Sequence, residues 1–130
     1  MSDQINVPIS PGELVDKITI LEIKKEFIKN DNKLKNINHE YDLLMQIYMT
    51  QISETNGISE LKNKLKEINL ELWKIEDDIR ECERKKNFDQ NFIDLARSVY
   101  FTNDERSKIK LQINNKFGSK LIEVKSYEKY

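Results

Sequence analysis

The arginines of this chain are few and confined to one stretch. Of its 22 basic residues only four are arginines, and all of them lie between Arg80 and Arg106. In a chain that otherwise uses lysine, an arginine is favoured where a planar group with two parallel donors is needed. Such a group suits a carboxylate or a phosphate. The chemistry that these residues suggest is therefore the binding of an anion.

Carboxylates accompany the arginines, and two interpretations stay open. The candidate ligand-binding residues are Arg80, Arg97, Arg106, Asp78, Glu83 and Asn103. In the first interpretation, the charged side chains form salt bridges between helices and set which helices pair. In the second, the arginines hold an anionic ligand in a polar pocket at mid-bundle, and the carboxylates orient them.

Other site chemistry finds little support in the sequence. A single histidine, His39, and a single cysteine, Cys82, exclude a multi-histidine metal site, a cysteine-based zinc site and an intramolecular disulfide. Glu13 and Asp16 are spaced as in carboxylate metal sites of helical bundles, but acids at this spacing more often form a solvated face. We therefore predict no metal and no cofactor. Whether the protein is an enzyme stays open.

Acidic and basic residues nearly cancel, because 22 Lys+Arg stand against 23 Asp+Glu and the formal net charge is -1. Nucleic-acid-binding domains usually carry a basic surplus, so that class is disfavoured. No apolar run approaches the roughly 18 residues of a membrane-spanning helix. The lone cysteine suits a reducing compartment. We predict a cytoplasmic protein that binds neither nucleic acid nor a membrane.

Glycines and prolines divide the chain into helical regions. They stand at positions 8, 11, 12, 57 and 118, which leaves residues 13–56 and 58–117 without a strong helix breaker. Ser10-Pro11-Gly12-Glu13 is a typical helix start, and Asn30-Asp31-Asn32 predicts a break within the first region. We expect one helical domain over residues 1–130, with residues 1–10 extended and residues 119–130 as a tail.

The third predicted helix has the clearest pattern. Its apolar residues repeat at intervals of 4-3-4-3-4-3, typical of a coiled-coil-like seam. They are Leu61, Leu65, Ile68, Leu72, Ile75, Ile79 and Cys82. Trp73 lies outside this seam, so we expect either that a further helix covers it or that it belongs to a binding surface.

Residues 90–117 continue the same rhythm, with the polar Thr102 and Arg106 at two seam positions. Either one helix with a polar patch spans this region, or Thr102-Asn103-Asp104-Glu105 is a capping box that begins a fifth helix. The continuous phase of the pattern favours one helix. In the tail, Leu121–Val124 is typical of an extended segment and could pair with Ile5–Ile9.

Four strings of sequence resemble those of a known family. They are PISPGELVDKITILEIK (Pro8–Lys24), LWKIEDDIRECER (Leu72–Arg84), FIDLARSVYFTNDER (Phe92–Arg106) and EVKSYEKY (Glu123–Tyr130). Over nearly its full length, the chain resembles an uncharacterised family of small bacterial and phage helical proteins, classed as a domain of unknown function. The resemblance implies a stand-alone, mostly helical module. It brings no activity, cofactor or site residue.

The sequence thus predicts an all-α fold: an antiparallel helical bundle of four or five helices, with long third and fourth helices and short extended terminal segments. The function we expect is a non-catalytic helical interaction or ligand-binding module with a polar centre of arginines and carboxylates. The alternative is a small helical-bundle enzyme that acts on an anionic metabolite, with or without the help of a metal. The expected partners are a second copy of the chain, another protein or a small anionic ligand.

Overall fold

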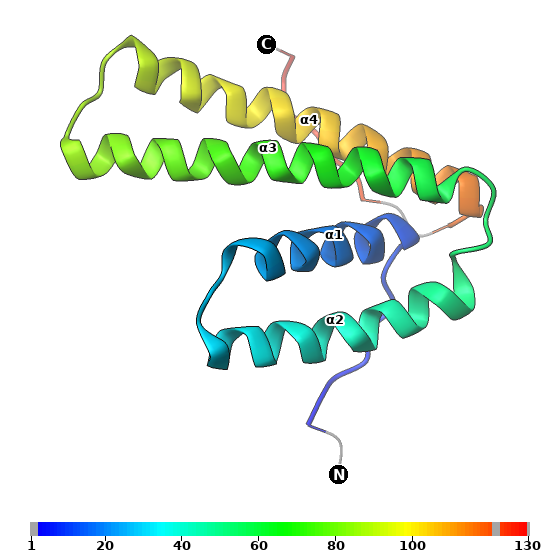
Figure 1. The fold of residues 1–130 in the computed structure, drawn as a ribbon. Coiled ribbons are helices and arrows are strands. Elements are labelled where there is room, and N and C mark those ends of the chain that lie inside the picture. The colour runs from blue at the N-terminus through cyan, green and yellow to red at the C-terminus, as the bar shows by residue number, and fades with distance from the viewer. Residues whose placement is uncertain (1–2, 121–122, 130) are drawn as a thin grey trace.

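The fold consists of four α-helices in the computed structural model, which describes residues 3–120 and 123–129. The helices are α1 (Pro11–Phe27), α2 (Asp31–Gln51), α3 (Ile58–Lys85) and α4 (Gln90–Phe117). Consecutive helices run antiparallel, and the long α3 and α4 lie side by side (Figure 1). The predicted all-α bundle with long third and fourth helices is confirmed.

Local sequence signals set the helix ends. Ser10 caps α1 by accepting a hydrogen bond from the Glu13 amide at 3.2 Å, and Pro11 takes the first helical position. Asn30 and Asp89 cap α2 and α4 in the same way. Gly118 ends α4 with a left-handed φ of 80°, which a glycine adopts without steric cost.

Residues 90–117 form one uninterrupted helix, as the phase of the pattern favoured. Thr102-Asn103-Asp104-Glu105 lies in the middle of α4, so this capping box does not begin a fifth helix. The suggested pairing of the two termini is not found. Ile5–Ile9 forms no strand, Val124 is exposed, and Leu121 and Ile122 lie outside the described residues.

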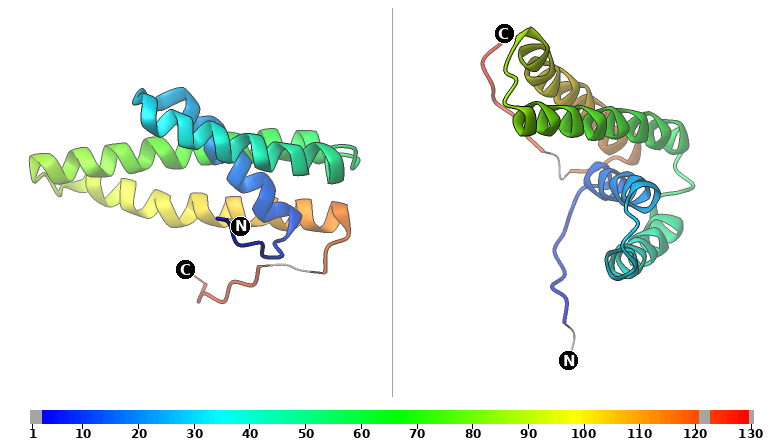
Figure 2. Two further views of the ribbon diagram at one scale, coloured as in Figure 1. Left: turned by 90° about the horizontal axis from the view of Figure 1, so that it is seen from below. Right: turned by 60° about the vertical axis from the view of Figure 1, so that its left-hand side comes forward.

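Helix α1 lies at the centre of the molecule, because it packs against each of the other three helices. It crosses α3 and α4 obliquely, and α2 covers its opposite side (Figure 2). The main core forms where the beginnings of α1 and α3 meet the ends of α2 and α4. Its fully buried residues include Val15, Ile18, Ile58, Leu65 and Ile113. The α3 seam turns inward, as predicted, since four of its seven residues are buried and the other three are partly buried. The buried ones are Leu61, Leu65, Ile75 and Cys82.

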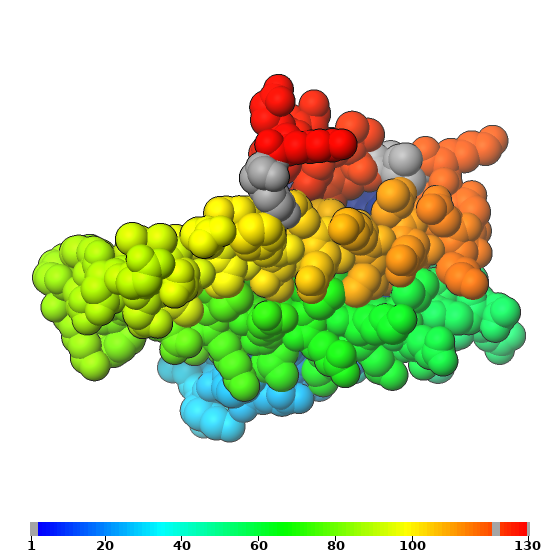
Figure 3. All heavy atoms as spheres, turned by 90° about the horizontal axis from the view of Figure 1, so that it is seen from above, coloured from blue at the N-terminus to red at the C-terminus, as the bar shows by residue number. Residues whose placement is uncertain are grey.

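The α3–α4 pair extends beyond α1 and α2 as a two-helix arm, which we define as residues 76–85 of α3 and 90–101 of α4. The space-filling view shows this arm projecting at one end (Figure 3). The ring of Phe27, the last residue of α1, stacks on Trp73 at a centroid distance of 5.7 Å and marks where the arm begins. The end of α1 therefore covers part of Trp73, which remains partly exposed, so the expectation that a further helix covers it is met in part.

Candidate functional site

A buried network of polar side chains joins α1 to α3 and α4. We call it the polar cluster and define it by seven residues: Glu13, Asp16, Thr19, Asn69, Arg106, Lys110 and Asn114. Helix interfaces are usually apolar, so the hydrogen-bond partners of these buried polar groups have to be explained one by one.

Asp16 is the centre of the cluster and is 1% exposed. Arg106 binds its carboxylate with two parallel donors, Nε to Oδ1 at 2.9 Å and Nη2 to Oδ2. Asn69 of α3 donates from Nδ2 to Oδ1 at 2.9 Å. These bonds satisfy the buried charge, since each carboxylate oxygen accepts a strong hydrogen bond. The hydrogen bond to Asp16 raises the pKa of Arg106, although burial opposes the rise.

Thr19 and Asn69 hold Asp16 in place. The Thr19 hydroxyl donates to the Asp16 backbone carbonyl at 2.8 Å and accepts from Asn69 Nδ2 at 2.9 Å. Both side chains are buried, so neither is free to exchange partners with water. The Asp16 carboxylate is therefore fixed in one orientation toward α4.

Lys110 forms the second charged contact between α1 and α4. Its Nζ donates to Glu13 Oε2 at 2.8 Å and to Glu123 Oε2 of the tail at 3.0 Å, and it lies 3.9 Å from Asp16 Oδ2. Burial lowers the pKa of Lys110, but the hydrogen bonds to the two glutamates outweigh burial and raise it above its ordinary value. The hydrogen bond to Lys110 lowers the pKa of Glu123.

Gly12 lets the backbone of α1 approach α4 closely. Its amide donates to Asn114 Oδ1 at 2.7 Å, and a Cβ at this position would lie 2.5 Å from the Lys110 carbonyl oxygen. No side chain larger than hydrogen fits there without a shift of the backbone. The start of α1 is therefore held against α4 by shape as well as by charge.

The structure brings together two of the six sequence-predicted site residues. Arg106 Nη1 lies 3.5 Å from Asn103 Oδ1, next to the Asp16 contact. Arg80 instead pairs with Glu76 on its own helix. Glu83 likewise pairs with Lys86 near the end of α3. Both of these pairs are exposed to solvent.

Arg97 and Asp78 also lie on the arm, away from the polar cluster. The Arg97 guanidinium lies over the Phe101 ring, 5.9 Å from its centroid. Asp78 lines a pocket near the turn between α3 and α4. The proposed centre of Arg80, Arg97, Asp78 and Glu83 therefore does not converge with Arg106 on one point.

Sequence reasoning missed Asn69 and Lys110 as members of the centre and weighed Asp16 only as part of a carboxylate pair. The sequence feature that indicates the polar cluster is the interruption of apolar stripes by polar residues. Thr102 and Arg106 replace apolar residues in the α4 seam, and Asp16 interrupts the apolar run of α1. Polar residues at buried positions of two helices predict partners for each other.

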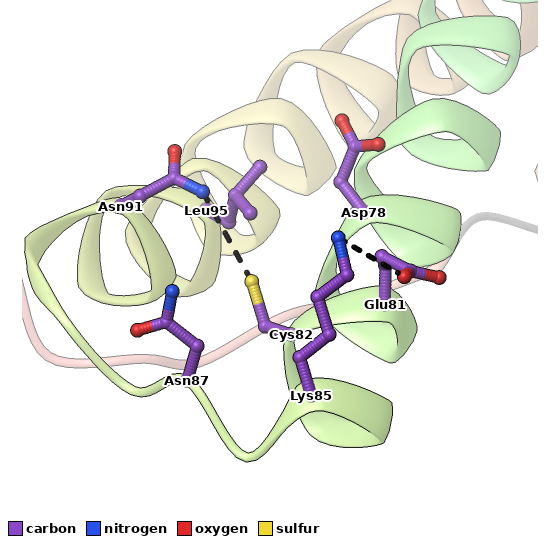
Figure 4. A pocket seen from close by; sticks show the side chains of 7 residues that line it. All are labelled: Asp78, Glu81, Cys82, Lys85, Asn87, Asn91 and Leu95. Atoms are coloured by element: carbon purple, nitrogen blue, oxygen red, sulfur yellow. Dashed lines mark hydrogen bonds and ion pairs between the residues drawn. The ribbon is translucent and has the colours of Figure 1, made fainter.

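The pocket near the α3–α4 turn has a volume of about 360 Å³. It is lined by Asp78, Glu81, Cys82, Lys85, Asn87, Asn91 and Leu95 (Figure 4). Four of the lining residues form two pairs within the pocket: Asn91 Nδ2 lies 4.0 Å from Cys82 Sγ, and Lys85 Nζ lies 3.4 Å from Glu81 Oε1. Its lining has no arginine, and its charged groups are paired or face solvent.

A second, smaller pocket of about 180 Å³ lies between α4 and the tail. Its lining residues are Ser107, Lys108, Lys110, Leu111, Asn114, Glu123 and Lys125. Lys110 and Asn114 belong to the polar cluster, so this pocket opens onto the edge of that network.

Two classes of site lack support in the described ranges. Residues 3–120 and 123–129 contain no group of three or more histidine, cysteine or acidic side chains arranged to hold a metal ion. Within the same ranges, none of the helices combines the length and the apolar character that a membrane crossing requires.

Comparison with known proteins places the chain in a family by sequence alone. No curated protein and no solved structure matches it significantly. A family model does match, over residues 5–130, and this range includes all four helices and the whole polar cluster. The protein therefore belongs to the family of unknown function DUF6165.

Proposed function

We propose that this protein is a non-catalytic helical interaction module that works as a homodimer, with the arm of α4 as the contact surface. The polar cluster serves as the internal support that fixes the helices on which this surface is built. The observation that carries the proposal is a stripe of exposed apolar side chains on the arm, on the side of α4 that faces away from its seam with α3.

We call this the outer stripe and define it as Ile93, Ala96 and Tyr100. Ile93 is 46% exposed and Tyr100 is 41% exposed. Their intervals of three and four residues place them on one face of a helix. This pattern is typical of a surface that packs against a second helix, with the small Ala96 allowing close approach.

The same face is covered by other parts of the chain further along α4. Continuing by three and four from Tyr100 leads to Asn103, Ser107, Lys110 and Asn114. In that half α1 contacts Lys110 and Asn114, and the tail reaches Lys110. The outer stripe is thus the half of a helix face that α1 is too short to cover.

A second copy fits the stripe because the sequence of α4 matches itself in the antiparallel direction. With a two-fold axis between Ala96 and Arg97, Ile93 of one protomer faces the partner's Tyr100. Each apolar contact then occurs twice, as an isologous interface requires.

The pairing of the arginines supports an interaction module over the enzyme alternative. Arg80 and Arg106 bind carboxylates within the chain, as does Arg84 with Glu81, and Arg97 lies over an aromatic ring. A site for an anionic metabolite would need at least two arginines that converge on a pocket. Neither of the two pockets above is lined by an arginine.

Sedimentation velocity of the full chain over a range of concentrations tests the proposal. We expect a species of twice the 15.5 kDa chain mass. Ala96→Glu introduces a charge at the closest approach of the two helices and should give a monomer. Gln112→Glu adds the same charge at an exposed position of α4 outside the stripe and should leave the dimer intact.

Circular dichroism of both variants checks that the helices are retained. A wild-type chain that stays monomeric at all concentrations would overturn the proposed homodimer. An Ala96→Glu variant that dimerises as well as the wild type would show that the contact lies on another surface, and would equally overturn it.

A further inference from the structure

The pocket between α4 and the tail combines a cavity with an unusual excess of lysines. Lys108, Lys110 and Lys125 line it, against the single carboxylate of Glu123. Most of the lining surface is apolar, because Leu111 and the methylene stems of the lysines contribute to it. The pocket is on the covered half of α4, away from the outer stripe, and plays no part in the proposed dimer.

The tail is folded back onto α4 in a defined way. Gly118 reverses the chain, and the Ser119 amide donates to the Asn114 carbonyl at 2.9 Å. Glu123 then lies with its carboxylate 3.0 Å from Lys110 Nζ. This contact joins the tail to α4 at the edge of the pocket.

The Glu123 contact is of a kind that a competing anion can displace. The Lys110 side chain is 10% exposed, whereas that of Glu123 is 45% exposed. Lys110 also keeps its contact with Glu13 at 2.8 Å, so it has a partner whether or not Glu123 is bound. A half-exposed ion pair is weak, because water competes for both groups.

The remaining polar groups of the pocket favour an anion over other ligands. Asn114 Oδ1 already accepts a hydrogen bond from the Gly12 amide. The other polar group of this side chain, Nδ2, is a hydrogen-bond donor, which suits an anion. Lys108 and Lys125 add two further ammonium groups. The Lys110 ammonium group is already shared among Glu13, Glu123 and, at 3.9 Å, Asp16, so the additional positive charge beside Glu123 comes from Lys108 and Lys125.

We propose that this pocket binds a phosphate group and that Glu123 competes with it for Lys110. The volume of about 180 Å³ has room for a phosphate group, since it corresponds to about six water molecules at roughly 30 Å³ each. Lysines recognise phosphate as point charges, whereas a planar carboxylate is better matched by an arginine fork. Three lysines also favour the higher charge of a phosphate.

Isothermal titration of inorganic phosphate into the full chain, at constant ionic strength, tests the proposal. Glu123→Gln removes the competing charge and should bind phosphate roughly two- to fivefold tighter than the wild type, the factor that corresponds to one exposed ion pair. Lys108→Ala, added to Glu123→Gln, should weaken binding again. Lys35→Ala in the same background removes an exposed lysine of α2 and should leave the affinity unchanged.

NMR chemical shifts of the backbone amides locate the binding site. The amide signals of Ser107 and Asn114 should shift when phosphate is added. A Glu123→Gln variant that binds no more tightly than the wild type would overturn the proposal. The same holds if Lys108→Ala and Lys35→Ala have equal effects, because binding would then follow total charge. Vesicles of phosphatidylcholine with phosphatidic acid form a second arm, and binding confined to vesicles would also overturn it, since this pocket should accept free phosphate.

Discussion

The carboxylate of Asp16 and the guanidinium of Arg106 meet through two parallel hydrogen bonds, although the residues are 90 positions apart in the chain. The Asp16 side chain is 2% exposed and that of Arg106 is 27% exposed. The pair thus links the first helix to the last at a point that water barely reaches. Its two-donor geometry fixes both the distance and the rotation of α1 relative to α4.

Asp16→Ala should lower the free energy of unfolding by about 3 kcal/mol, because it leaves Arg106 and Asn69 without their acceptor. This is the lower end of the range for buried pairs, since Arg106 is partly exposed. Urea unfolding followed by circular dichroism measures the loss. Glu76→Ala removes the partner of the exposed Arg80 and should cost less than about 1 kcal/mol.

The double variant Asp16→Ala with Arg106→Ala distinguishes the ion pair from general packing. The double variant should lose less stability than the sum of the losses in the two single variants, because each single change already removes the same contact. Strict additivity of the two single losses would contradict a direct coupling between these side chains.

Gly12→Ala should destabilise the fold by about 1 to 3 kcal/mol, since the new Cβ would lie 2.5 Å from a backbone carbonyl that cannot rotate away. Thermal or urea unfolding provides the measurement. At Gly118 a Cβ meets nothing within 4 Å, so Gly118→Ala serves as a control that costs only the strain of its positive φ. That cost is about 1 kcal/mol. Wild-type stability of Gly12→Ala would argue against the close approach of α1 and α4.

Tyr41 should titrate abnormally. Desolvation by burial, followed by its hydrogen bond to Glu22 at 3.0 Å, raises the pKa of Tyr41 from 10.0 to about 12. Because the folded state favours the protonated phenol, the stability from this contact is present below pH 10. It is lost as the pH rises from about 10 to about 12.

NMR titration of the Tyr41 ring carbon next to the hydroxyl follows this pKa directly. Glu22→Gln removes the negative charge beside the phenol and should lower the pKa of Tyr41 toward 10.0. An unchanged titration in Glu22→Gln would mean that the carboxylate has no part in the shift.

Phe27→Ala should shift the fluorescence of Trp73 to longer wavelength. Trp73 is the single tryptophan of the chain, and the Phe27 ring covers it at 5.7 Å. Removal of that ring exposes the indole to water and loosens the end of α1 on α3. Phe88→Ala removes an exposed ring at the α3–α4 turn and should leave the emission unchanged. Equal spectra for the two variants would contradict the stacking of Phe27 on Trp73.

Much of the fold follows from apolar spacing and chain breakers. The seam from Leu61 to Cys82 predicts the long α3, and Gly118 predicts the end of α4. The unbroken phase through Thr102 predicts one helix over residues 90–117. These signals are local, because a helix end or a helix face depends on residues within one or two turns.

The site was harder to predict because it depends on how far each helix reaches. α1 has 17 residues, α3 has 28, and the two cross obliquely, so at about 1.5 Å per residue α1 extends along less than two thirds of α3. Arg80 and Glu83 lie beyond its end and pair with residues three or four positions away in the chain. Arg106 lies under α1 and finds Asp16. Heptad position alone does not distinguish Arg106 from Arg80 and Glu83. The crossing of α1 does, because it reaches only Arg106.

The central position of α1 has a consequence for how the chain folds during synthesis. α1 is synthesised before the other three helices. Its partners in α4 come much later: Asp16 binds Arg106, and Gly12 binds Asn114, which is 102 residues further along the chain. On the ribosome, the buried face of α1, which carries Asp16, must therefore stay without its final neighbours until α4 has emerged. Contacts between such distant residues close slowly, so we expect nascent chains that lack α4 to hold α1 and α2 as a loose hairpin, and to depend on chaperones or to be degraded.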